Sequence, residues 1–282
     1  MRIVFSVLEL IEPHRGECLS AKMRRILKRP KVDPVPFEIK GAGFTIIRAE
    51  LLSDGQPDWE EIAWVAKEYS RWIILPQNLS PDFAVGSGIK VFSTAQFDKE
   101  VLLKTVCRML HFSQIPMYRR VVALLDDSGE HADMLFSLLH YCTSVKVVTR
   151  DLGLYEQSAN KMMEKLGAPV FVSDVMSGLY DCVLALSPGN FSSGEDVSIP
   201  FPIAITEKST LKLHRNCNMF TGLKAALPEG CSPPGEIDPH SLAGALYTLS
   251  GAGFIDPIAH NMLYSNRYVN IAQASQIISK AL

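Results

Sequence analysis

Apolar positions between residues 120 and 206 follow the alternation that is typical of an α/β domain. Short, nearly continuous apolar runs predict strands, and apolar residues three and four apart predict the helices between them. The predicted order is strand 120–125, helix 130–142, strand 145–149, helix 154–166, and strands 170–173, 182–186 and 203–206. Strands that are apolar throughout indicate a parallel sheet covered on both faces. We therefore expect a Rossmann-like, doubly wound, mostly parallel sheet.

A smaller α/β pattern precedes this sheet. Its predicted elements are strand 44–52, a helix from Asp58, and strands 72–75 and 89–93. Asp58 and Glu61 have the spacing of a capping box, which marks a helix start. A long helix over 95–112 carries its apolar side chains on one stripe, and we expect it to join the two halves.

The two ends of the chain complete the predicted organisation. Prolines at positions 30, 34 and 36 argue against regular structure there, so residues 1–36 are interpreted as an N-terminal appendage with a basic helix over 19–31. The pairs Asp238-Pro239 and Asp256-Pro257 each predict a helix start, and a further helix is expected at the C-terminus. The predicted domains are the appendage 1–36, a small α/β module 37–94, and a Rossmann-like domain 95–282 with C-terminal helices. Whether the module folds separately or extends the same sheet stays open.

Composition narrows the class of protein. The chain has 282 residues, 47% hydrophobic and 21% charged, which is typical of globular proteins. A net charge of −2 gives no overall attraction to nucleic acid or anionic membranes. We find neither a signal peptide nor a stretch of about 20 apolar residues that would span a membrane. Six scattered cysteines without a C-x-x-C pair predict no zinc site and no redox motif, so we expect a reducing, cytoplasmic location.

The candidate ligand site lies at the carboxyl ends of the predicted strands, where an open parallel sheet binds its ligands. Three segments hold those places: the loop 126–131 and the strand ends 149–151 and 186–190. The candidate cofactor-binding residues are Asp127, Ser128, Gly129, Glu130, Thr149, Arg150, Asp151, Ser187 and Gly189. Ser128, His131 and Asp133 crowd around one helix start, which favours capping over a catalytic triad, so no catalytic residue and no metal site is assigned.

A long helix is followed by strand, turn and helix, then by the segments Val147–Asp151 and Ala185–Gly189. This order over residues 95–190 resembles the cofactor half of shikimate-dehydrogenase-like proteins. The resemblance implies that Arg150 holds the 2′-phosphate of NADP. It also implies that the loop Ser187–Gly189 faces the nicotinamide.

The turn after the first strand of this sheet departs from that family. It reads Asp126-Asp127-Ser128-Gly129-Glu130, with one glycine where the dinucleotide fingerprint has three. Asp127 and Glu130 are spaced as a reciprocal cap, which would occupy the amides that otherwise hold a pyrophosphate. Ordinary NAD(P) binding is therefore disfavoured, and the cofactor stays undefined.

Three hypotheses of function follow. The leading one is a Rossmann-like ligand-binding or protein-interaction protein without ordinary dehydrogenase activity, whose small-molecule or protein partner is unknown. The alternatives are an NADP-dependent oxidoreductase that uses Arg150, and a nucleic-acid- or membrane-surface-associated factor that works through residues 19–31. Neutral total charge favours a solvated face for that basic helix, so we do not expect nucleic acid as a partner. A polar cluster of His214, Arg215, Asn216 and Asn218 fits a surface loop or the ligand site, and a homodimer through the C-terminal helices stays open.

Overall fold

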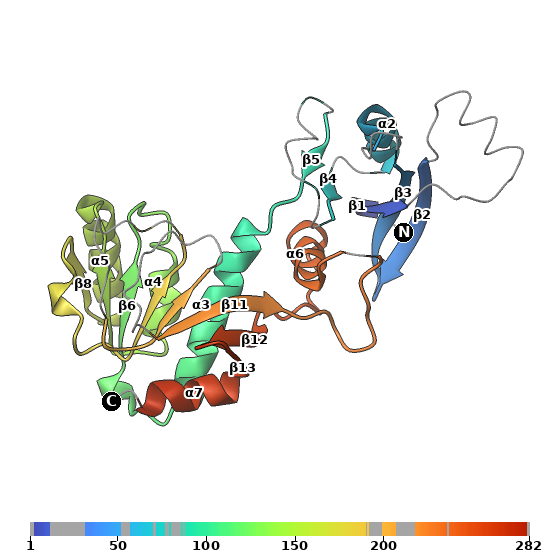
Figure 1. The fold of residues 1–282 in the computed structure, drawn as a ribbon. Coiled ribbons are helices and arrows are strands. Elements are labelled where there is room, and N and C mark those ends of the chain that lie inside the picture. Colours follow the sequence, from blue (N-terminus) through green and yellow to red (C-terminus); the bar gives the residue numbers. More distant parts are fainter. Residues whose placement is uncertain are drawn as a thin grey trace, which may run out of the picture. The chain divides into compact units, whose positions relative to one another are not determined.

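The structure is a computed structural model that describes residues 3–11, 32–51, 57–69, 72–76, 79, 86, 88–189, 191, 199–206, 218–235 and 237–280 (Figure 1). It consists of two compact units. Unit 1 contains residues 1–94 and 227–256, and unit 2 contains residues 95–226 and 257–282. The chain therefore starts in unit 1, builds most of unit 2, and returns to unit 1 before it ends in unit 2. The basic helix expected over 19–31 lies outside the described residues.

Unit 1 is built on a five-stranded sheet in the order β2-β3-β1-β4-β5. Its strands are β1 (Ile3–Ile11), β2 (Val32–Ile39), β3 (Ala42–Glu50), β4 (Trp72–Ile74) and β5 (Lys90–Val91). β1 pairs in parallel with β3 and β4, and β4 in parallel with β5, whereas β2 pairs antiparallel with β3. The helix α2 (Trp59–Tyr69) packs its buried side chains, Ile62 among them, against this sheet.

The prediction that residues 1–36 form an appendage is wrong. Within that range, β1 is the central strand of this sheet, and β2, which begins there, is one of its edges. Pro34 and Pro36 both lie within β2, opposite Ile47 and Thr45. They lie two residues apart on an edge strand, which has a partner on one side only and is where a sheet tolerates nitrogens without a hydrogen. Prolines at these positions therefore do not prevent pairing.

The returning segment of unit 1 forms the helix α6 (Pro239–Ser250), as the Asp238-Pro239 pair predicted. The Asp238 carboxylate accepts a hydrogen bond from the main-chain nitrogen of Ser241 at 3.2 Å, and Pro239 occupies the first turn. This helix packs against β1 and β4. Residues 227–256 were assigned from the sequence to the Rossmann-like domain, and the structure groups them with unit 1 instead.

Unit 2 contains an eight-stranded sheet in the order β13-β12-β11-β10-β9-β6-β7-β8. Its strands are β6 (Val121–Leu125), β7 (Ser144–Val148), β8 (Val170–Ser173), β9 (Leu184–Ser187), β10 (Ile203–Ile205), β11 (Met219–Ala225), β12 (Ala259–Tyr264) and β13 (Arg267–Val269). The six strands from β6 to β11 are parallel, and β12 and β13 extend the sheet antiparallel. Counted along the chain, the parallel strands have the order 3-2-1-4-5-6, which is that of the Rossmann fold. The predicted fold class is confirmed, and the switch point lies between β6 and β9.

The helical elements of unit 2 are α3 (Ala95–Phe112), η2 (Met117–Arg119), α4 (Met134–Leu139), α5 (Leu152–Leu166), η3 (Met176–Gly178) and α7 (Ile271–Lys280). α3 follows the predicted bounds and packs against α4, α7, β10 and β11. α5 packs against β8 and ends at Gly167, which has the left-handed conformation of a helix stop. No helix within the described ranges is long and apolar enough to cross a membrane.

The second half of the chain differs from the prediction in two places. No helix begins at Asp256-Pro257, because strand β12 starts at Ala259, whose main-chain nitrogen donates to the Thr105 hydroxyl at 2.9 Å. The strand β11, over Met219–Ala225, was not predicted at all. Its run interleaves Thr221, Gly222 and Lys224 with apolar residues, which weakens the signal of a buried parallel strand.

Candidate functional site

The loop that follows β6 is organised around one carboxylate, that of Asp126, which is fully buried. Its Oδ1 accepts hydrogen bonds from the main-chain nitrogen of Ser128 at 3.1 Å and from the Ser128 hydroxyl at 2.8 Å. Its Oδ2 accepts from the main-chain nitrogen of His131 at 3.1 Å and from the Tyr155 hydroxyl at 2.6 Å. Two amides of the loop are thus bound by the chain's own carboxylate.

The local sequence explains this arrangement. An aspartate directly after an apolar strand closes an Asx turn onto the amide two residues later, here that of Ser128. Gly129 then takes a positive φ of 71°, a conformation that other residues adopt only under strain. A Cβ atom at this glycine would lie 2.9 Å from Leu154 Cδ2, so the loop also packs too closely on α5 for a side chain.

Asp126 is ionised at neutral pH in this environment. Burial raises the pKa of the carboxyl, but the neighbouring His131, Tyr155 and Ser128 side chains lower it by more, so that it lies well below its ordinary value. For Tyr155 both effects act in the same direction. Burial, and then the accepting and negatively charged Asp126, raise the pKa of the Tyr155 hydroxyl well above its ordinary value. The hydroxyl is therefore a fixed donor to the carboxylate.

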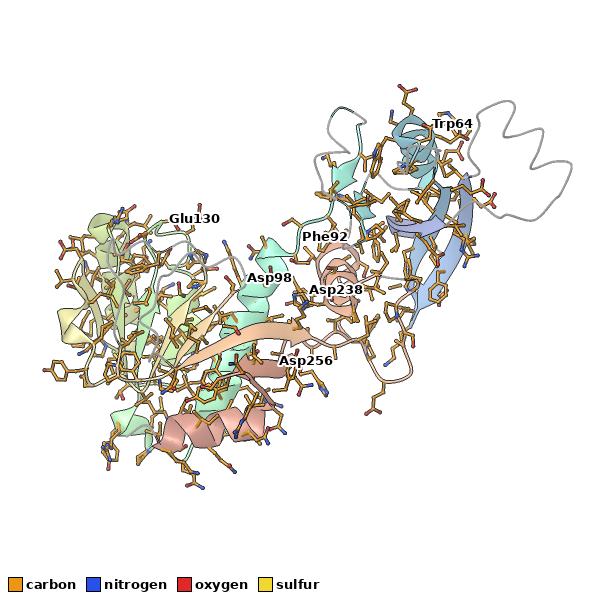
Figure 2. The ribbon with its side chains drawn as sticks, in the orientation of Figure 1. Trp64, Phe92, Asp98, Glu130, Asp238 and Asp256 are labelled. Carbon is orange, nitrogen blue, oxygen red and sulfur yellow. The ribbon has the colours of Figure 1, made fainter. Side chains whose placement is uncertain are left out.

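The reciprocal cap predicted for Asp127 and Glu130 is not what binds the loop amides. The helix α4 begins only at Met134, and the main-chain nitrogen of Glu130 donates to the Ser128 hydroxyl at 3.3 Å. The Glu130 carboxylate is exposed and lies 3.9 Å from Lys99 Nζ, at the surface of unit 2 (Figure 2). A carboxylate does bind loop amides, as predicted from the sequence, but the one that binds the amides of Ser128 and His131 is that of Asp126.

The loops after β6 and β7 meet through Asp127 and Arg150. Arg150 Nε lies 3.8 Å from Asp127 Oδ2, and the arginine side chain is 67% exposed. An arginine at the end of the second strand is where the resemblance placed the contact to a 2′-phosphate. In this structure that guanidinium shares its position with a carboxylate, which would compete with such a phosphate.

Thr149 and Asp151 have structural roles at the end of β7. The Thr149 hydroxyl accepts from the main-chain nitrogen of Asp151 at 3.0 Å. Asp151 is the N-cap of α5, and its Oδ1 accepts from the main-chain nitrogen of Leu154 at 3.2 Å. Both side chains thus hold the start of α5, the helix that delivers Tyr155 to Asp126.

The loop after β9 meets the loop after β6 through Gly189 and His131. A Cβ atom at Gly189 would lie 3.0 Å from His131 Cε1, so the imidazole packs directly on the glycine main chain. The Ser187 hydroxyl donates within its own loop to the Gly189 carbonyl oxygen at 3.5 Å. Asn190, which belonged to the predicted strand end, lies outside the described residues, as do His214, Arg215 and Asn216.

His131 is the ionisable side chain at the centre of these loops, and it is 3% exposed. Its Nδ1 lies 3.1 Å from Asp126 Oδ1. Neither ring nitrogen has a well-aligned hydrogen-bond partner among the described residues. The Ser128 hydroxyl is bonded to Asp126, and Asp133 is exposed at the start of α4, so these residues do not form a triad with His131. No group of residues suited to a metal ion occurs in the described part of the chain.

Comparison with known proteins adds a likeness of fold. No protein-family model and no curated protein matches the chain. Several solved structures are similar at low identity. Three of them are the Δ1-pyrroline-2-carboxylate reductase of Thermococcus litoralis in complex with NADH and L-proline (9% identity, TM-score 0.30, 65% of this chain and 60% of that chain), the L-tryptophan dehydrogenase of Nostoc punctiforme (14%, 0.36, 99% and 79%) and the 5-ketofructose reductase of a Gluconobacter species (10%, 0.35, 100% and 99%).

The chain spans 60% of the length of the pyrroline-carboxylate reductase that it matches. The Rossmann-type resemblance predicted from the sequence is confirmed at the level of the fold, and the strand order of unit 2 carries that conclusion. The roles of the loop residues rest on the geometry of this chain.

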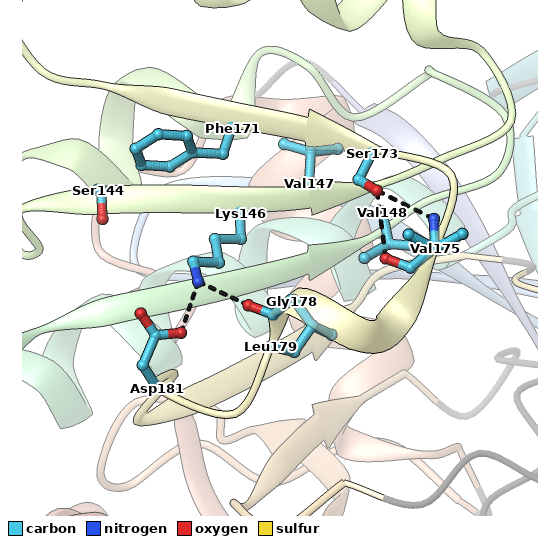
Figure 3. Close-up of a pocket in the computed structure, with 10 residues that line it drawn as sticks. All are labelled: Ser144, Lys146, Val147, Val148, Phe171, Ser173, Val175, Gly178, Leu179 and Asp181. Atoms are coloured by element: carbon cyan, nitrogen blue, oxygen red, sulfur yellow. Dashed lines mark hydrogen bonds and ion pairs between the residues drawn. The ribbon is translucent and has the colours of Figure 1, made fainter.

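A cavity of about 320 Å³ opens on the face of β7 and β8 (Figure 3). It is lined by Ser144, Lys146, Val147, Val148, Phe171, Ser173, Val175, Gly178, Leu179 and Asp181. The chain between β8 and β9 forms only the short η3 and not an α-helix, so it covers this face incompletely. Phe171 is 56% exposed as a result.

The charged groups in the lining of this cavity bind each other. Lys146 Nζ donates to Asp181 Oδ1 and to the Gly178 carbonyl oxygen, both at 2.6 Å. The sequence analysis missed this feature. A lysine inside an otherwise apolar strand, followed after β8 by a stretch without helical spacing, was the available signal.

Sequence reasoning also missed the group that matters most, Asp126 with His131 and Tyr155. The sequence places Asp126 in the candidate loop 126–131 and Tyr155 in the predicted helix 154–166, and no local pattern connects the two. Asp126 and Tyr155 are 29 residues apart in the chain and meet because β6 and β7 are neighbouring strands. The pattern that links them is an aspartate directly after one buried strand and a tyrosine one turn into the helix that follows the neighbouring strand.

Proposed function

We propose that unit 2 is a ligand-binding module whose site is formed by the loops after β6, β7 and β9, called here the switch-point loops (residues 126–131, 149–151 and 187–189). The ligand has no diphosphate group, and the protein does not catalyse an ordinary NAD(P)-dependent dehydrogenation. One observation supports this most directly. The buried Asp126 carboxylate accepts hydrogen bonds from the main-chain nitrogens of Ser128 and His131, in the turn where a dinucleotide fold offers amides to pyrophosphate.

The electrostatics of the loops support the same proposal. A diphosphate seated on this turn would meet the ionised Asp126 beneath it and Asp127 and Glu130 beside it. Each contact between like charges costs about 1 kcal/mol in water and about 4 kcal/mol at the dielectric of a protein surface. Asp133 and Asp151 add negative charge close to Tyr155. Lys99 and Arg150 lie near Glu130 and Asp127 and offset only part of this charge.

A thermal-shift screen tests the proposal. The panel contains NADP, NAD, a flavin nucleotide, simple nucleotides, adenosine and S-adenosylmethionine. A ligand at 100 times its dissociation constant adds about 2.7 kcal/mol of stability, which corresponds to a rise of several degrees. We expect a shift from a compound without a diphosphate and none from NADP or NAD. A clear shift with NADP would contradict the proposal.

The second candidate, NADP binding through Arg150, is favoured by the position and exposure of that guanidinium at the end of β7. Arg150→Ala separates the two candidates. If NADP stabilises the protein and Arg150→Ala removes the effect, the oxidoreductase hypothesis replaces the one above. Lys104→Ala serves as the control, because it removes one positive charge from α3 outside the switch-point loops.

We also propose that the protein works in a reducing compartment, the cytoplasm. Cys107, Cys142 and Cys182 are buried as free thiols. Burial raises the pKa of each to about 12, so these thiols remain protonated at neutral pH. Buried, unreactive thiols of this kind serve as small apolar side chains and are typical of proteins from reducing compartments.

A further inference from the structure

The His131 side chain lies at the switch point, with Asp126 beside Nδ1 and no partner for Nε2 among the described residues. It is 3% exposed, and among the described residues neither ring nitrogen makes an aligned hydrogen bond. Buried polar atoms in folded proteins are nearly always hydrogen-bonded, so a buried ring nitrogen without a partner needs an explanation. The position of the ring, between the loops after β6 and β9, is where a Rossmann-like sheet binds its ligands.

Asp126 determines which ring nitrogen carries the proton. Its ionised carboxylate lies 3.1 Å from Nδ1, and that distance is attractive to an N–H group and repulsive to a lone pair. Of the two singly protonated forms of the ring, this contact favours the one with the proton on Nδ1, in which Nε2 carries a lone pair that accepts hydrogen bonds. Tyr155 and Ser128 hold the carboxylate in this place from the other sides.

The Cε1–Nε2 edge of the ring faces the loop after β9. A Cβ atom at Gly189 would lie 3.6 Å from Nε2 and 3.0 Å from Cε1, so the glycine main chain covers this side of the ring. The main chain of Gly189 closes the position and offers Nε2 no hydrogen bond. A ligand group that takes up this position would meet an acceptor that is held in place and has no partner.

We propose that His131 Nε2 accepts a hydrogen bond from a hydroxyl or amino group of the ligand, a neutral or cationic small molecule without phosphate. This inference rests on the function proposed above and names the ligand class for the same loops. The surrounding carboxylates determine which ligand charge is favoured, because Asp126, Asp127 and Glu130 repel anions and attract cations. Binding separates Gly189 from the imidazole, since Nε2 is covered in this structure.

The first test is the tautomer of His131, read from the nitrogen-15 chemical shifts of the imidazole in the full-length protein at neutral pH. The proposal requires a protonated Nδ1 and an unprotonated Nε2. A ring protonated on Nε2 would overturn it, because such a nitrogen donates and does not accept. This readout does not depend on any ligand.

The second test uses three probes without phosphate: adenosine, S-adenosylmethionine and myo-inositol. At least one is expected to shift the Nε2 resonance, and His131→Asn, which keeps a polar group near Nδ1 but removes Nε2, is expected to weaken its binding about tenfold. His131→Gln, whose amide reaches the position of Nε2, is expected to retain most of the affinity. If no probe perturbs Nε2, the inference is wrong.

The outcomes separate this inference from the proposed function. If a probe binds His131→Asn as tightly as the wild type, and leaves the Nε2 resonance of the wild type unchanged, the role proposed for His131 is wrong. The function proposed for the loops is then still supported. If NADP instead shifts the Ser128 and Gly129 amides, the proposed function itself falls. Gly189→Ala, which places a methyl group against the imidazole, is expected to weaken or abolish the binding of the same probe.

Discussion

Tyr155 and Asp126 form a buried pair in which the phenol hydroxyl donates to the carboxylate at 2.6 Å. The pair connects the first turn of α5 to the loop after β6, and both side chains are fully buried. Without the Tyr155 hydroxyl, the Asp126 carboxylate would lose a strong hydrogen-bond donor. The stability of unit 2 and the closure of the loop to anions therefore depend on the same contact.

Tyr155→Phe removes only the hydroxyl from this pair. We expect a loss of about 2 kcal/mol in the free energy of unfolding, because a hydrogen bond to a buried charge is removed. Urea unfolding at neutral pH measures the loss. Tyr180→Phe is the matched control, since Tyr180 is 80% exposed, and it is expected to change the stability by less than about 0.5 kcal/mol.

Tyr155 also predicts a loss of stability at high pH. Its pKa is raised in the folded protein, so above pH 10 the unfolded chain releases this proton while the folded chain keeps it. The contribution of Tyr155 is complete below the ordinary pKa of tyrosine and falls as the pH rises beyond it. Unfolding curves between pH 8 and 11 should show a smaller decline in Tyr155→Phe than in the wild type, and equal declines would refute the assignment.

Asp126 predicts the opposite behaviour at low pH. Its folded-state pKa is depressed, so its contribution is present above the ordinary pKa of aspartate and is lost as the pH falls below it. Asp126→Asn should be less stable than the wild type by about 3 kcal/mol at neutral pH. The difference between the two proteins should shrink as the pH falls below about 4. A difference that stays constant between pH 7 and 3 would show that Asp126 is not ionised in the folded protein.

Gly129, which packs on α5, and Gly153, which lies within it, give a matched pair of substitutions. Gly129→Ala is expected to destabilise unit 2 by about 2 kcal/mol, because φ is positive and a Cβ atom would lie 2.9 Å from Leu154. Gly153→Ala lies within the helix with nothing inside 4 Å of the added atom, and it should stabilise by about 0.5–1 kcal/mol. Thermal unfolding of both variants measures the two effects, and effects of the same sign would contradict the loop geometry.

The thiols give a chemical check of the core. Burial raises the pKa of Cys107 and Cys182 to about 12, whereas Cys231 is partly exposed. At pH 8 in the folded protein, a thiol reagent followed by site-resolved mass spectrometry should label Cys231 well before Cys107 or Cys182. All three should react in denaturant. Rapid native labelling of Cys107 would show that α3 is not packed as described.

The sequence predicts most of the Rossmann-like sheet because its signals there are local. The apolar runs of β6, β7 and β8, the stripe on α3 and the stop at Gly167 each lie within a few residues. The errors come from pairing that a local pattern does not contain. β2 tolerates Pro34 and Pro36 because it is an edge strand, and the segment after Asp256-Pro257 becomes β12 because β11 lies beside it.

The candidate site was predicted in position but not in mechanism. The carboxyl ends of β6, β7 and β9 follow from the fold class, and the structure brings Asp127 to Arg150 and Gly189 to His131. Spacing alone suggested that Asp127 and Glu130 close the turn. The role of Asp126 depends on Tyr155, 29 residues away, and no rule of local capping relates the two.

Whether Asp126 closes this turn to diphosphates can be read directly from a titration of the nitrogen-15-labelled protein with NADP. The amide resonances of Ser128, Gly129 and His131 report on the turn itself. We predict that they stay unchanged up to millimolar NADP. Saturable shifts of these amides at micromolar NADP would show a diphosphate on the turn and would contradict the account.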